Sequence, residues 1–402
     1  HFLPATHALS NLSFRLSYGL IAGLNYKGNA LPTFASGLTS RYRNQENERN
    51  IFIYALQNSD FTWEKVYETN FGTDIGLFGN RINLSLDLYQ KNSKDLMDIV
   101  RTSGMGGEIY KYANDASMVT RGFELVVDTR NFKTDDFSWN TSVNFAYFNQ
   151  EITALANSLA SVFSLVRETG GNVLGGARNT LYSYDFIGLN NQGMPMFNLK
   201  NGSTNYQDID FQDRDNILSY LKKEGAVDPN ITGGLSNTFR YKNWELSFLI
   251  TMQAGNKIRK APRYSATGYS DLSVFPKEFK NRWMAPGDEA TTNIPGIVST
   301  RTLNETNKAL ISRAYSAYNN STQRVVDGSF VRMKSISLSY TFPKEVLESL
   351  KLSNLTLRLQ ASNPFLIYAH KDLNGQDPEF FRSGGVSYPI TPQYTFTINF
   401  GI

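Results

Sequence analysis

Apolar and polar residues alternate one by one in several segments of this chain. In residues 335–342 every even position is Ile, Leu, Tyr or Phe, and every odd position is Ser or Thr. Because successive side chains of a β-strand point to opposite faces, one face of this segment suits an apolar medium and the other suits water. The alternation recurs in residues 12–20 and 396–402. Such strands, repeated at intervals, are typical of a β-barrel in a membrane.

About ten such strands are predicted, and short and long connections alternate between them. The predicted strands are, approximately, 11–24, 61–78, one that starts at residue 82, 119–131, 137–149, 232–241, 244–253, 335–342, 355–363 and 393–402. The long connections are 153–229, which is predicted to be irregular, 254–326 and 364–392. Residues 343–353 are predicted to contain one short helix. Because outer-membrane barrels have short periplasmic turns and long outer loops, we expect the long connections to be extracellular.

The composition agrees with strands, rather than helices, as the elements that cross a membrane. The 402 residues are 41% hydrophobic, with a mean hydropathy of -0.36. No stretch approaches the roughly 18 apolar residues of a transmembrane helix, whereas a barrel strand needs about 9–11 residues, of which half face lipid. The 27 Phe, 22 Tyr and 4 Trp residues provide ample aromatic side chains for interfacial girdles.

Charge and the rare residue types exclude other classes of function. The net charge is only +4, and no basic run is interleaved with aromatic residues, so nucleic-acid binding is not expected. The absence of Cys excludes disulfides and thiolate metal sites. His1, His7 and His370 cannot be grouped by sequence, so a zinc site or a His-based catalytic site is not expected. Neither Met nor a signal peptide opens the chain, so we expect a processed chain or one part of a longer protein.

Six groups of residues carry a resemblance to a known family. They are NLSFRLSYG at 11–19, FTWEK at 61–65 with DIGLF at 74–78, RGFE at 121–124, RW with PGDE within 282–289, DGSFVRMK running into LSY within 327–340, and GQDPE at 375–379. In their order and spacing they resemble the C-terminal part of the SusC/RagA family, the TonB-dependent transporters of Bacteroidetes outer membranes.

The resemblance implies a fold and a location. The fold is all-β, a transmembrane antiparallel barrel of about 22 strands. Residues 1–402 would form about ten C-terminal strands with long extracellular loops. An N-terminal plug and a TonB box belong to the family and are not found in these residues. The protein would cross the outer membrane of a Gram-negative bacterium, one of the Bacteroidetes, many times and contact its lipids.

The resemblance also implies a function and partners. The function would be active import of a bulky nutrient, an oligosaccharide or an oligopeptide, and not catalysis. TonB would supply the energy through the absent N-terminal part, and a SusD-like surface lipoprotein would act as a lid. Two alternatives stay open. The first is a self-contained ten-stranded outer-membrane enzyme, such as a protease, although no paired acid and His motif is visible. The second is a soluble all-β adhesin, whose repeated apolar face would cause aggregation.

One acidic segment is a candidate metal site. Asp208, Asp210, Asp213 and Asp215 alternate with other residues and could supply the oxygen ligands that calcium prefers. The related family often has a D-x-N-x-D-G loop here, whereas this segment lacks the Gly and contains Arg214. The alternative is a solvated acidic loop. No other cofactor is expected.

Two further groups are candidates for contacts at the outer side. The first is a set of loop aromatics that could stack on sugar rings or peptide side chains, or could pack among the loops: Tyr182, Tyr184, Tyr264, Tyr269 and Tyr315. The second is Asp377-Pro378-Glu379, which we expect to contact the lid. Pro378 restricts the residue before it, and we expect the segment to present its carboxylates outward.

Overall fold

The computed structural model describes most of the chain. The described residues are 8–24, 31–37, 50–55, 57–104, 110–155, 160–266, 269, 272, 274–299, 301, 307–379 and 391–402. His1, His7 and residues 380–390 of the last long connection lie outside this set.

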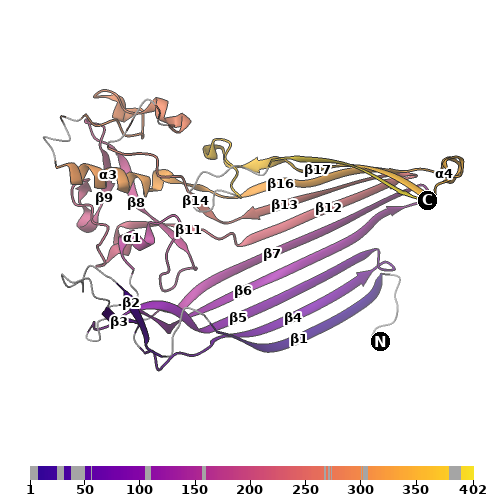
Figure 1. Ribbon diagram of the computed structural model, residues 1–402, viewed down its shortest axis with the longest axis horizontal. Coiled ribbons are helices and arrows are strands. Elements are labelled where there is room, and N and C mark those ends of the chain that lie inside the picture. Colours follow the sequence, from indigo (N-terminus) through magenta and orange to yellow (C-terminus); the bar gives the residue numbers. More distant parts are fainter. Residues whose placement is uncertain are drawn as a thin grey trace.

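Ten long strands form one antiparallel sheet, in which each strand pairs with the neighbours that precede and follow it among the ten (Figure 1). They are β1 (Leu9–Gly23), β4 (Glu64–Leu77), β5 (Ile82–Arg101), β6 (Tyr110–Lys133), β7 (Phe137–Leu155), β12 (Ile231–Tyr241), β13 (Trp244–Ala254), β16 (Phe330–Thr341), β17 (Asn354–Ala369) and β18 (Gln393–Gly401). Each strand predicted from the alternation lies in this sheet.

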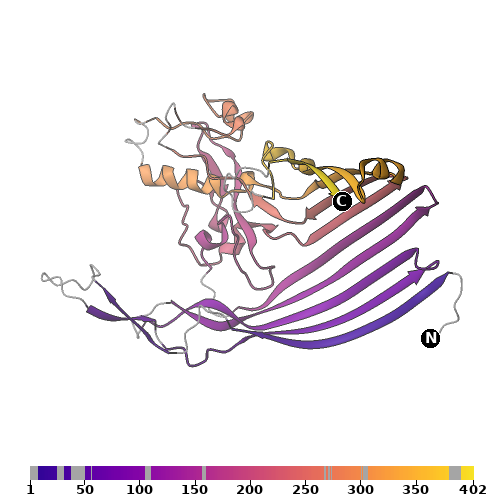
Figure 2. The same ribbon diagram turned by 45° about the vertical axis from the view of Figure 1, so that its right-hand side comes forward.

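The short and long connections lie at opposite ends of the sheet, as predicted. Figures 1 and 2 show a curved sheet whose short turns gather at one end, together with the C-terminus and the start of β1. The connection from β16 to β17 contains α4 (Lys344–Leu350), the short helix predicted there. At the opposite end, the connection from β1 to β4 contains a hairpin of β2 (Thr33–Gly37) and β3 (Asn50–Ala55).

The two faces of the sheet differ as the alternation predicts. In β16 the side chain of Leu338 is 41% exposed, whereas its neighbour Ser339 is only 9% exposed. Leu338 pairs across the ladder with Leu246 and Leu359, so the outer face is continuously apolar there. Apolar side chains are also exposed along the two edge strands β1 and β18. The outer face is therefore suited to lipid.

Several strands extend further than the alternation predicts. β6 begins at Tyr110, not near residue 119, and β5 continues to Arg101. The two strands remain paired in this extension, where Ile99 lies opposite Tyr112. Backbone hydrogen bonds hold a ladder together whatever the side chains are, so strands can continue where the apolar alternation has ended.

The inner face of the sheet carries charged groups that are paired with one another. Arg15 of β1 forms ion pairs with Asp74 of β4 and with Asp87 of β5, which lies 3.4 Å away. Asp74 also accepts a hydrogen bond from Ser85 at 2.7 Å. Gly72 leaves the space for this cluster, because a Cβ there would lie 2.6 Å from Asp87 Oδ1 and 2.8 Å from the Arg15 guanidinium. Ion pairs thus connect neighbouring strands on the inner face.

The long connections after β7 and β13 are folded, which corrects the prediction of an irregular stretch at 153–229. The described residues of 160–227 and 257–327 form one unit, here called the loop domain. Its strands are β8 (Thr180–Leu189), β9 (Pro195–Asn198), β10 (Thr204–Asn205), β11 (Leu221–Ala226), β14 (Lys257–Arg259) and β15 (Val325–Asp327). Its helices are α1 (Val162–Leu165), α3 (Lys308–Asn319) and the 3-10 turns η1 (Lys200–Gly202), η2 (Ile217–Ser219), η3 (Lys277–Asn281), η4 (Asp288–Ala290) and η5 (Thr322–Arg324).

Helix α3 joins the two long connections into this one unit. Asn307 caps its N-terminus by accepting a hydrogen bond from the Ala309 amide at 3.0 Å. Ile311, Tyr315 and Tyr318 follow at helical spacing and form its buried face. This face packs with residues of β8 and β9 in the core of the loop domain. The structure was missed from the sequence because the contacts join segments more than a hundred residues apart.

No helix in the described part of the chain is long and apolar enough to cross a membrane.

Candidate functional site

The loop aromatics predicted to meet a substrate are part of the core of the loop domain. Tyr182, Tyr184, Tyr264 and Tyr315 are buried, and the partly buried Tyr269 packs against this core. A ring buried in a packed core offers little surface to a ligand, so these positions favour the packing role. Tyr184 also lines a pocket of about 330 Å³. Contact of the five rings with a substrate stays a prediction.

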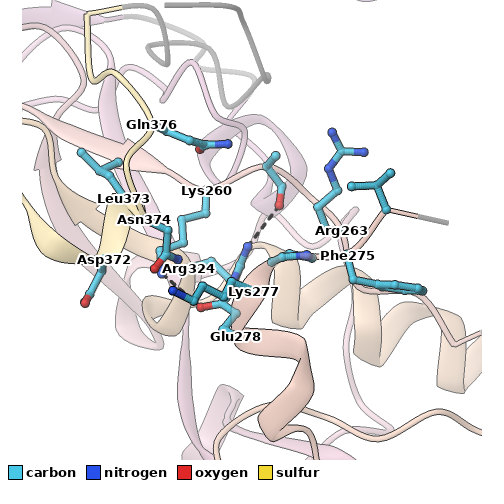
Figure 3. A pocket seen from close by; sticks show the side chains of 13 residues that line it. Lys260, Arg263, Phe275, Lys277, Glu278, Arg324, Asp372, Leu373, Asn374 and Gln376 are labelled. Carbon is cyan, nitrogen blue, oxygen red and sulfur yellow. Dashed lines mark hydrogen bonds and ion pairs between the residues drawn. The ribbon is translucent and has the colours of Figure 1, made fainter.

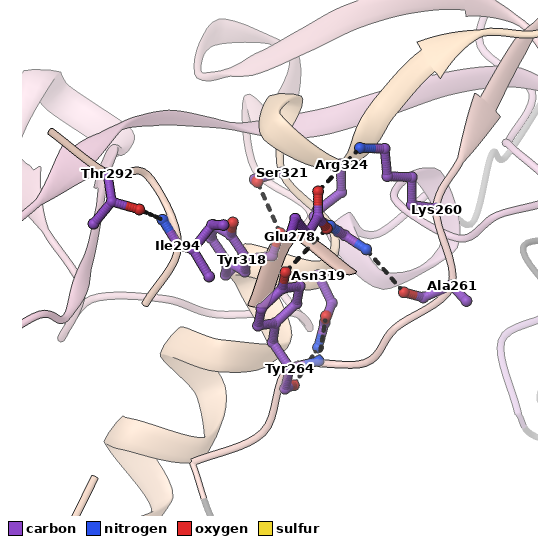
Figure 4. Close-up of polar contacts among 10 residues, drawn as sticks. All are labelled: Lys260, Ala261, Tyr264, Glu278, Thr292, Ile294, Tyr318, Asn319, Ser321 and Arg324. Atoms are coloured by element: carbon purple, nitrogen blue, oxygen red, sulfur yellow. Dashed lines mark hydrogen bonds and ion pairs between the residues drawn. The ribbon is translucent and has the colours of Figure 1, made fainter. Parts of the chain in front are cut away.

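Glu278, in η3, is the centre of a polar cluster beside this core (Figure 4). Its carboxylate forms an ion pair with Arg324 and lies 3.4 Å from Lys260 Nζ. It also accepts a hydrogen bond from the Tyr264 hydroxyl at 3.0 Å. Asn319, at the end of α3, donates to the Tyr264 carbonyl at 2.6 Å and so fixes this segment. The cluster ties three separate parts of the second long connection together.

The charge state of Glu278 follows from these contacts. Burial acts to raise the pKa of its carboxyl group, but the charges of Arg324 and Lys260, and the hydrogen bonds to the carboxylate, outweigh burial. The pKa of Glu278 therefore lies below its ordinary value. Glu278 is ionised at neutral pH, and its carboxylate is paired with Arg324 and Lys260.

Arg259 of β14 is a second, deeper anchor of the loop domain. Its buried guanidinium donates hydrogen bonds to the carbonyl oxygens of Tyr182 at 2.7 Å and Ser321 at 3.1 Å, and to Ser183 Oγ at 3.0 Å. Burial lowers the pKa of Arg259 to about 10, with Glu224 acting in the opposite direction. Arg259 is therefore still charged at neutral pH, and its donors link β14 to β8 and η5.

A pocket of about 280 Å³ opens beside the Glu278 cluster (Figure 3). One wall comes from the loop domain, from residues within 260–263 and 274–278 and from Arg324, and the other comes from residues within 372–376, at and after η6 (Lys371–Leu373). Four basic side chains line it, Lys260, Arg263, Lys277 and Arg324, together with the acidic Glu278 and Asp372 and with apolar residues that include Phe275 and Leu373. The pocket therefore combines an excess of positive charge with an apolar wall.

Three of the four aspartates predicted to bind calcium, Asp208, Asp210 and Asp213, line one pocket, and Asp215 does not line it. Asp213 accepts a hydrogen bond from the Tyr220 hydroxyl at 3.0 Å. Asp208 and Asp210 accept hydrogen bonds from groups two or three residues away in sequence. Within the described residues, which include all four aspartates, no three acidic or histidine side chains converge to hold a metal ion. Binding of a metal ion by these four aspartates stays a prediction.

The Asp377-Pro378-Glu379 segment turns its carboxylates inward, which corrects the predicted outward placement. Asp377 is buried in an ion pair with Arg332 of β16. Glu379 lies 3.1 Å from Arg332 Nε and 3.6 Å from Lys334 Nζ. The positive charges at the start of β16 hold the segment against the sheet and leave these carboxylates paired. Contact between this segment and a lid stays a prediction.

The RW and PGDE residues of 282–289 form a compact turn that docks on the loop domain. Trp283 Nε1 donates to Glu289 at 2.9 Å, and Asp288 accepts hydrogen bonds from the amides of Met284 and Ala285, each at 2.9 Å. The indole covers Gly193, where a Cβ would lie 2.5 Å from the ring. The motif therefore has a structural role here.

Gly193→Ala should destabilise the loop domain more than Gly202→Ala does. Both glycines have φ near +73°, at 74° and 73°, so Ala suffers the same backbone strain at each. Only at position 193 would the methyl group also collide with Trp283, because nothing lies within 4 Å of a Cβ at position 202. We expect an extra cost of about 1–3 kcal/mol at position 193. Hydrogen exchange of the β8 and β9 amides in the intact protein measures the loss of stability in each variant. Equal losses in the two variants would contradict the docking of Trp283 on Gly193.

Sequence patterns did not reveal the residues that build the pocket. Lys260, Glu278 and Arg324 come from separate segments, and each alone resembles an ordinary surface residue. One local signal was available, because three of the four residues at 257–260 are basic and they flank the apolar Ile258. Several basic residues next to a short apolar segment indicate that their side chains form ion pairs or hydrogen bonds with distant parts of the chain.

The family model and the curated relatives that match this chain are all TonB-dependent receptors. Residues 1–363 match the family model described as TonB dependent receptor-like, beta-barrel. The TonB-dependent receptor P39 of Formosa agariphila is 26% identical over 382 residues, which cover 83% of this chain and 34% of the relative. The TonB-dependent receptor SusC of Bacteroides thetaiotaomicron is 24% identical over 422 residues, which cover 100% of this chain and 38% of the relative. The chain thus spans a little over a third of the length of these curated relatives.

Solved structures show the same fold. The structure titled RagAB peptide transporter superposes with a TM-score of 0.78 at 23% sequence identity, over 100% of this chain and 42% of that chain. A structure of the RagAB peptide importer in its closed-closed state gives a TM-score of 0.75 at 23% identity, over 99% of this chain and 42% of that chain. The sheet and the loop domain thus have the arrangement of one part of these larger chains.

Proposed function

This chain belongs to the TonB-dependent receptor-like β-barrel family, and from that premise we propose that it forms part of the wall and outer mouth of an active outer-membrane importer. The resemblance to SusC and RagA is confirmed by the family match, the curated relatives and the solved structures. The imported nutrient would be bulky, an oligosaccharide or an oligopeptide, and the importer would work with a SusD-like lipoprotein and with TonB.

The observation that carries the proposal is the two-sided sheet with a folded cap at one end. Its outer face is apolar around Leu338, and its inner face holds the ion pairs of Arg15, Asp74 and Asp87. A wall of this kind separates lipid from a hydrated interior. The loop domain stands where long connections are extracellular, at the end at which a nutrient would arrive.

The open edges of the sheet support a larger barrel. β1 pairs only with β4, and β18 only with β17, so each edge strand leaves one row of backbone groups unpaired within the described residues. Unpaired backbone groups are very costly in lipid, so a sheet that spans a membrane must close. We propose that residues 1–402 are the C-terminal part of a barrel of about 22 strands, with the other strands, the plug and the TonB box supplied elsewhere in the protein.

Three observations favour this proposal over the two alternatives. A self-contained ten-stranded barrel would need β1 to pair with β18, but among the described residues these strands lie at opposite edges. The curated relatives are named as TonB-dependent receptors, which agrees with an importer better than with an enzyme. A soluble adhesin would leave the apolar face of β1 and β18 in water, where a patch of this size promotes aggregation.

The test is native purification of the intact protein from outer membranes, followed by uptake measurements. Mass spectrometry identifies the lipoprotein and the small molecules that copurify with it. Uptake of the identified molecule is then measured in cells with and without TonB. We expect a surface lipoprotein to copurify and uptake to be lost without TonB.

Two results would contradict the proposal. Uptake that persists unchanged without TonB would remove the energy source that the family membership suggests. Breakdown of the copurified molecule by the purified protein would favour the enzyme alternative.

A further inference from the structure

We propose that the pocket lined by residues within 260–263, 274–278 and 372–376 binds a carboxylate of an acidic peptide, with an adjacent apolar side chain of that peptide against its apolar wall. This inference rests on the proposed function, because it assigns a substrate class to the mouth of the importer. At about 280 Å³ the pocket accommodates about one or two residues of a ligand. It would therefore select one feature of a longer substrate.

The positive charge of the pocket is only partly neutralised. Glu278 is occupied by Arg324 and Lys260. Arg263 and Lys277 are exposed and line the same pocket, and no described carboxylate lies within ion-pair distance of either. These two cations are free to meet an anion that enters from solvent. An arginine and a lysine together suit a carboxylate, which the planar guanidinium can bind through two hydrogen bonds.

The second acidic side chain of the pocket does not change this balance. Asp372 lies at the edge of the pocket, on the opposite side from Arg263 and Phe275 (Figure 3). Its side chain is half exposed, and one oxygen lies 4.0 Å from His370 Nδ1. It is therefore placed away from Arg263, and it lies beyond ion-pair distance of Lys277.

The apolar wall favours a peptide over an acidic glycan. Phe275 is the aromatic residue among those that line the pocket, and one face of its ring is stacked on Phe279 at a centroid distance of 4.3 Å. Val274, Pro276 and Leu373 complete the wall. A sugar ring stacks best on a broad, free aromatic face, whereas an aliphatic or aromatic peptide side chain gains from any apolar contact of this kind.

Both walls are held in place without a ligand. Arg324 donates to the Ala261 carbonyl at 3.2 Å and binds Glu278, which fixes the wall made by the loop domain. The buried pair of Arg332 and Asp377 fixes the turn that forms the other wall. A site whose walls are already ordered loses less conformational freedom on binding, so even one or two ion pairs can produce measurable selectivity.

The test uses the intact purified protein and three defined probes. They are a decapeptide of alternating Glu and Leu, the same peptide with Gln in place of Glu, and a hexamer of galacturonic acid. Binding of each is measured by calorimetry to the wild type, to the double variant Arg263→Gln with Lys277→Gln, and to a control double variant. The control, Arg214→Gln with Lys223→Gln, removes the same charge from two exposed residues of the loop domain that do not line the pocket.

The expected result is selective. The Glu peptide binds the wild type about tenfold more tightly than the Gln peptide, since two partly exposed ion pairs together contribute an effect of this size. The pocket double variant loses this preference and binds both peptides equally. The control variant keeps the preference, which separates local contact from the general field of the protein.

Three results would overturn the inference. They are equal binding of the Glu and Gln peptides to the wild type, equal losses in the pocket and control variants, and a galacturonate hexamer that binds this pocket more tightly than the Glu peptide does. Binding is measured here without membranes or TonB. Failure of the binding test would therefore refute the peptide site and leave the proposed importer standing. Failure of the uptake test would refute the proposed function, and the binding result would stand by itself.

Discussion

Leu338→Arg should lower the free energy of unfolding of the intact protein in membranes by about 2–4 kcal/mol, whereas Ser339→Arg should cost far less. Leu338 lies between Leu246 and Leu359 on the outer face, where an arginine would meet lipid. Ser339 lies on the inner face, where a guanidinium reaches hydrated space. The two changes introduce the same side chain one residue apart, so only the face differs.

The measurement is reversible unfolding in lipid vesicles, followed by the tryptophan fluorescence of the intact protein. A second pair of variants repeats the comparison on β18, with Phe396→Arg on the apolar face and Thr397→Arg on the other. Equal costs within both pairs would show that the apolar face does not meet lipid and would contradict the barrel wall.

Arg332→Met should release the turn at 371–379 from the sheet, at a cost of about 3–5 kcal/mol in local stability. The side chains of Arg332 and Asp377 are only 3% and 5% exposed. Removing the arginine leaves a buried carboxylate without a counter-charge, which costs more than the pair itself contributes. Hydrogen exchange of the amides of residues 371–379 in the intact protein measures this release.

Two further variants separate this effect from loss of packing. Adding Asp377→Leu to Arg332→Met should restore most of the protection, because two apolar side chains can replace a buried ion pair at little cost. Arg178→Met breaks a more exposed pair, in which Arg178 lies 3.5 Å from Asp228, and should cost no more than about 1 kcal/mol. A double variant as unprotected as Arg332→Met alone would show that the buried charge is not the cause.

The same pair explains why the predicted role of Asp377 was partly wrong. From the sequence, an Asp-Pro-Glu run in a long connection resembles an exposed acidic turn. Its basic partners lie in β16, and Arg332 is 45 residues away in sequence. No local pattern records which charges meet across such a separation, so only the folded chain shows that these carboxylates point back to the sheet.

The burial of the loop tyrosines also depends on contacts between segments that are distant in the sequence. Tyr184 and Tyr315 lie on separate long connections, and in the sequence each has both polar and apolar neighbours. Their burial depends on α3 packing against β8 and β9. An aromatic residue in a loop could serve as a ligand platform or as core, and tertiary packing decides between these roles.

By itself, the sequence determined the ten strands of the sheet, their two faces and the gathering of the long connections at one end. These features depend on a period of two, which the backbone geometry of a strand imposes on neighbouring residues. Only the tertiary structure decided that the long connections form a loop domain, that Asp377 pairs with Arg332, and that Lys260, Glu278 and Arg324 surround a pocket. Each of those features depends on side chains from distant segments meeting in space, and no periodic pattern along the chain encodes such meetings.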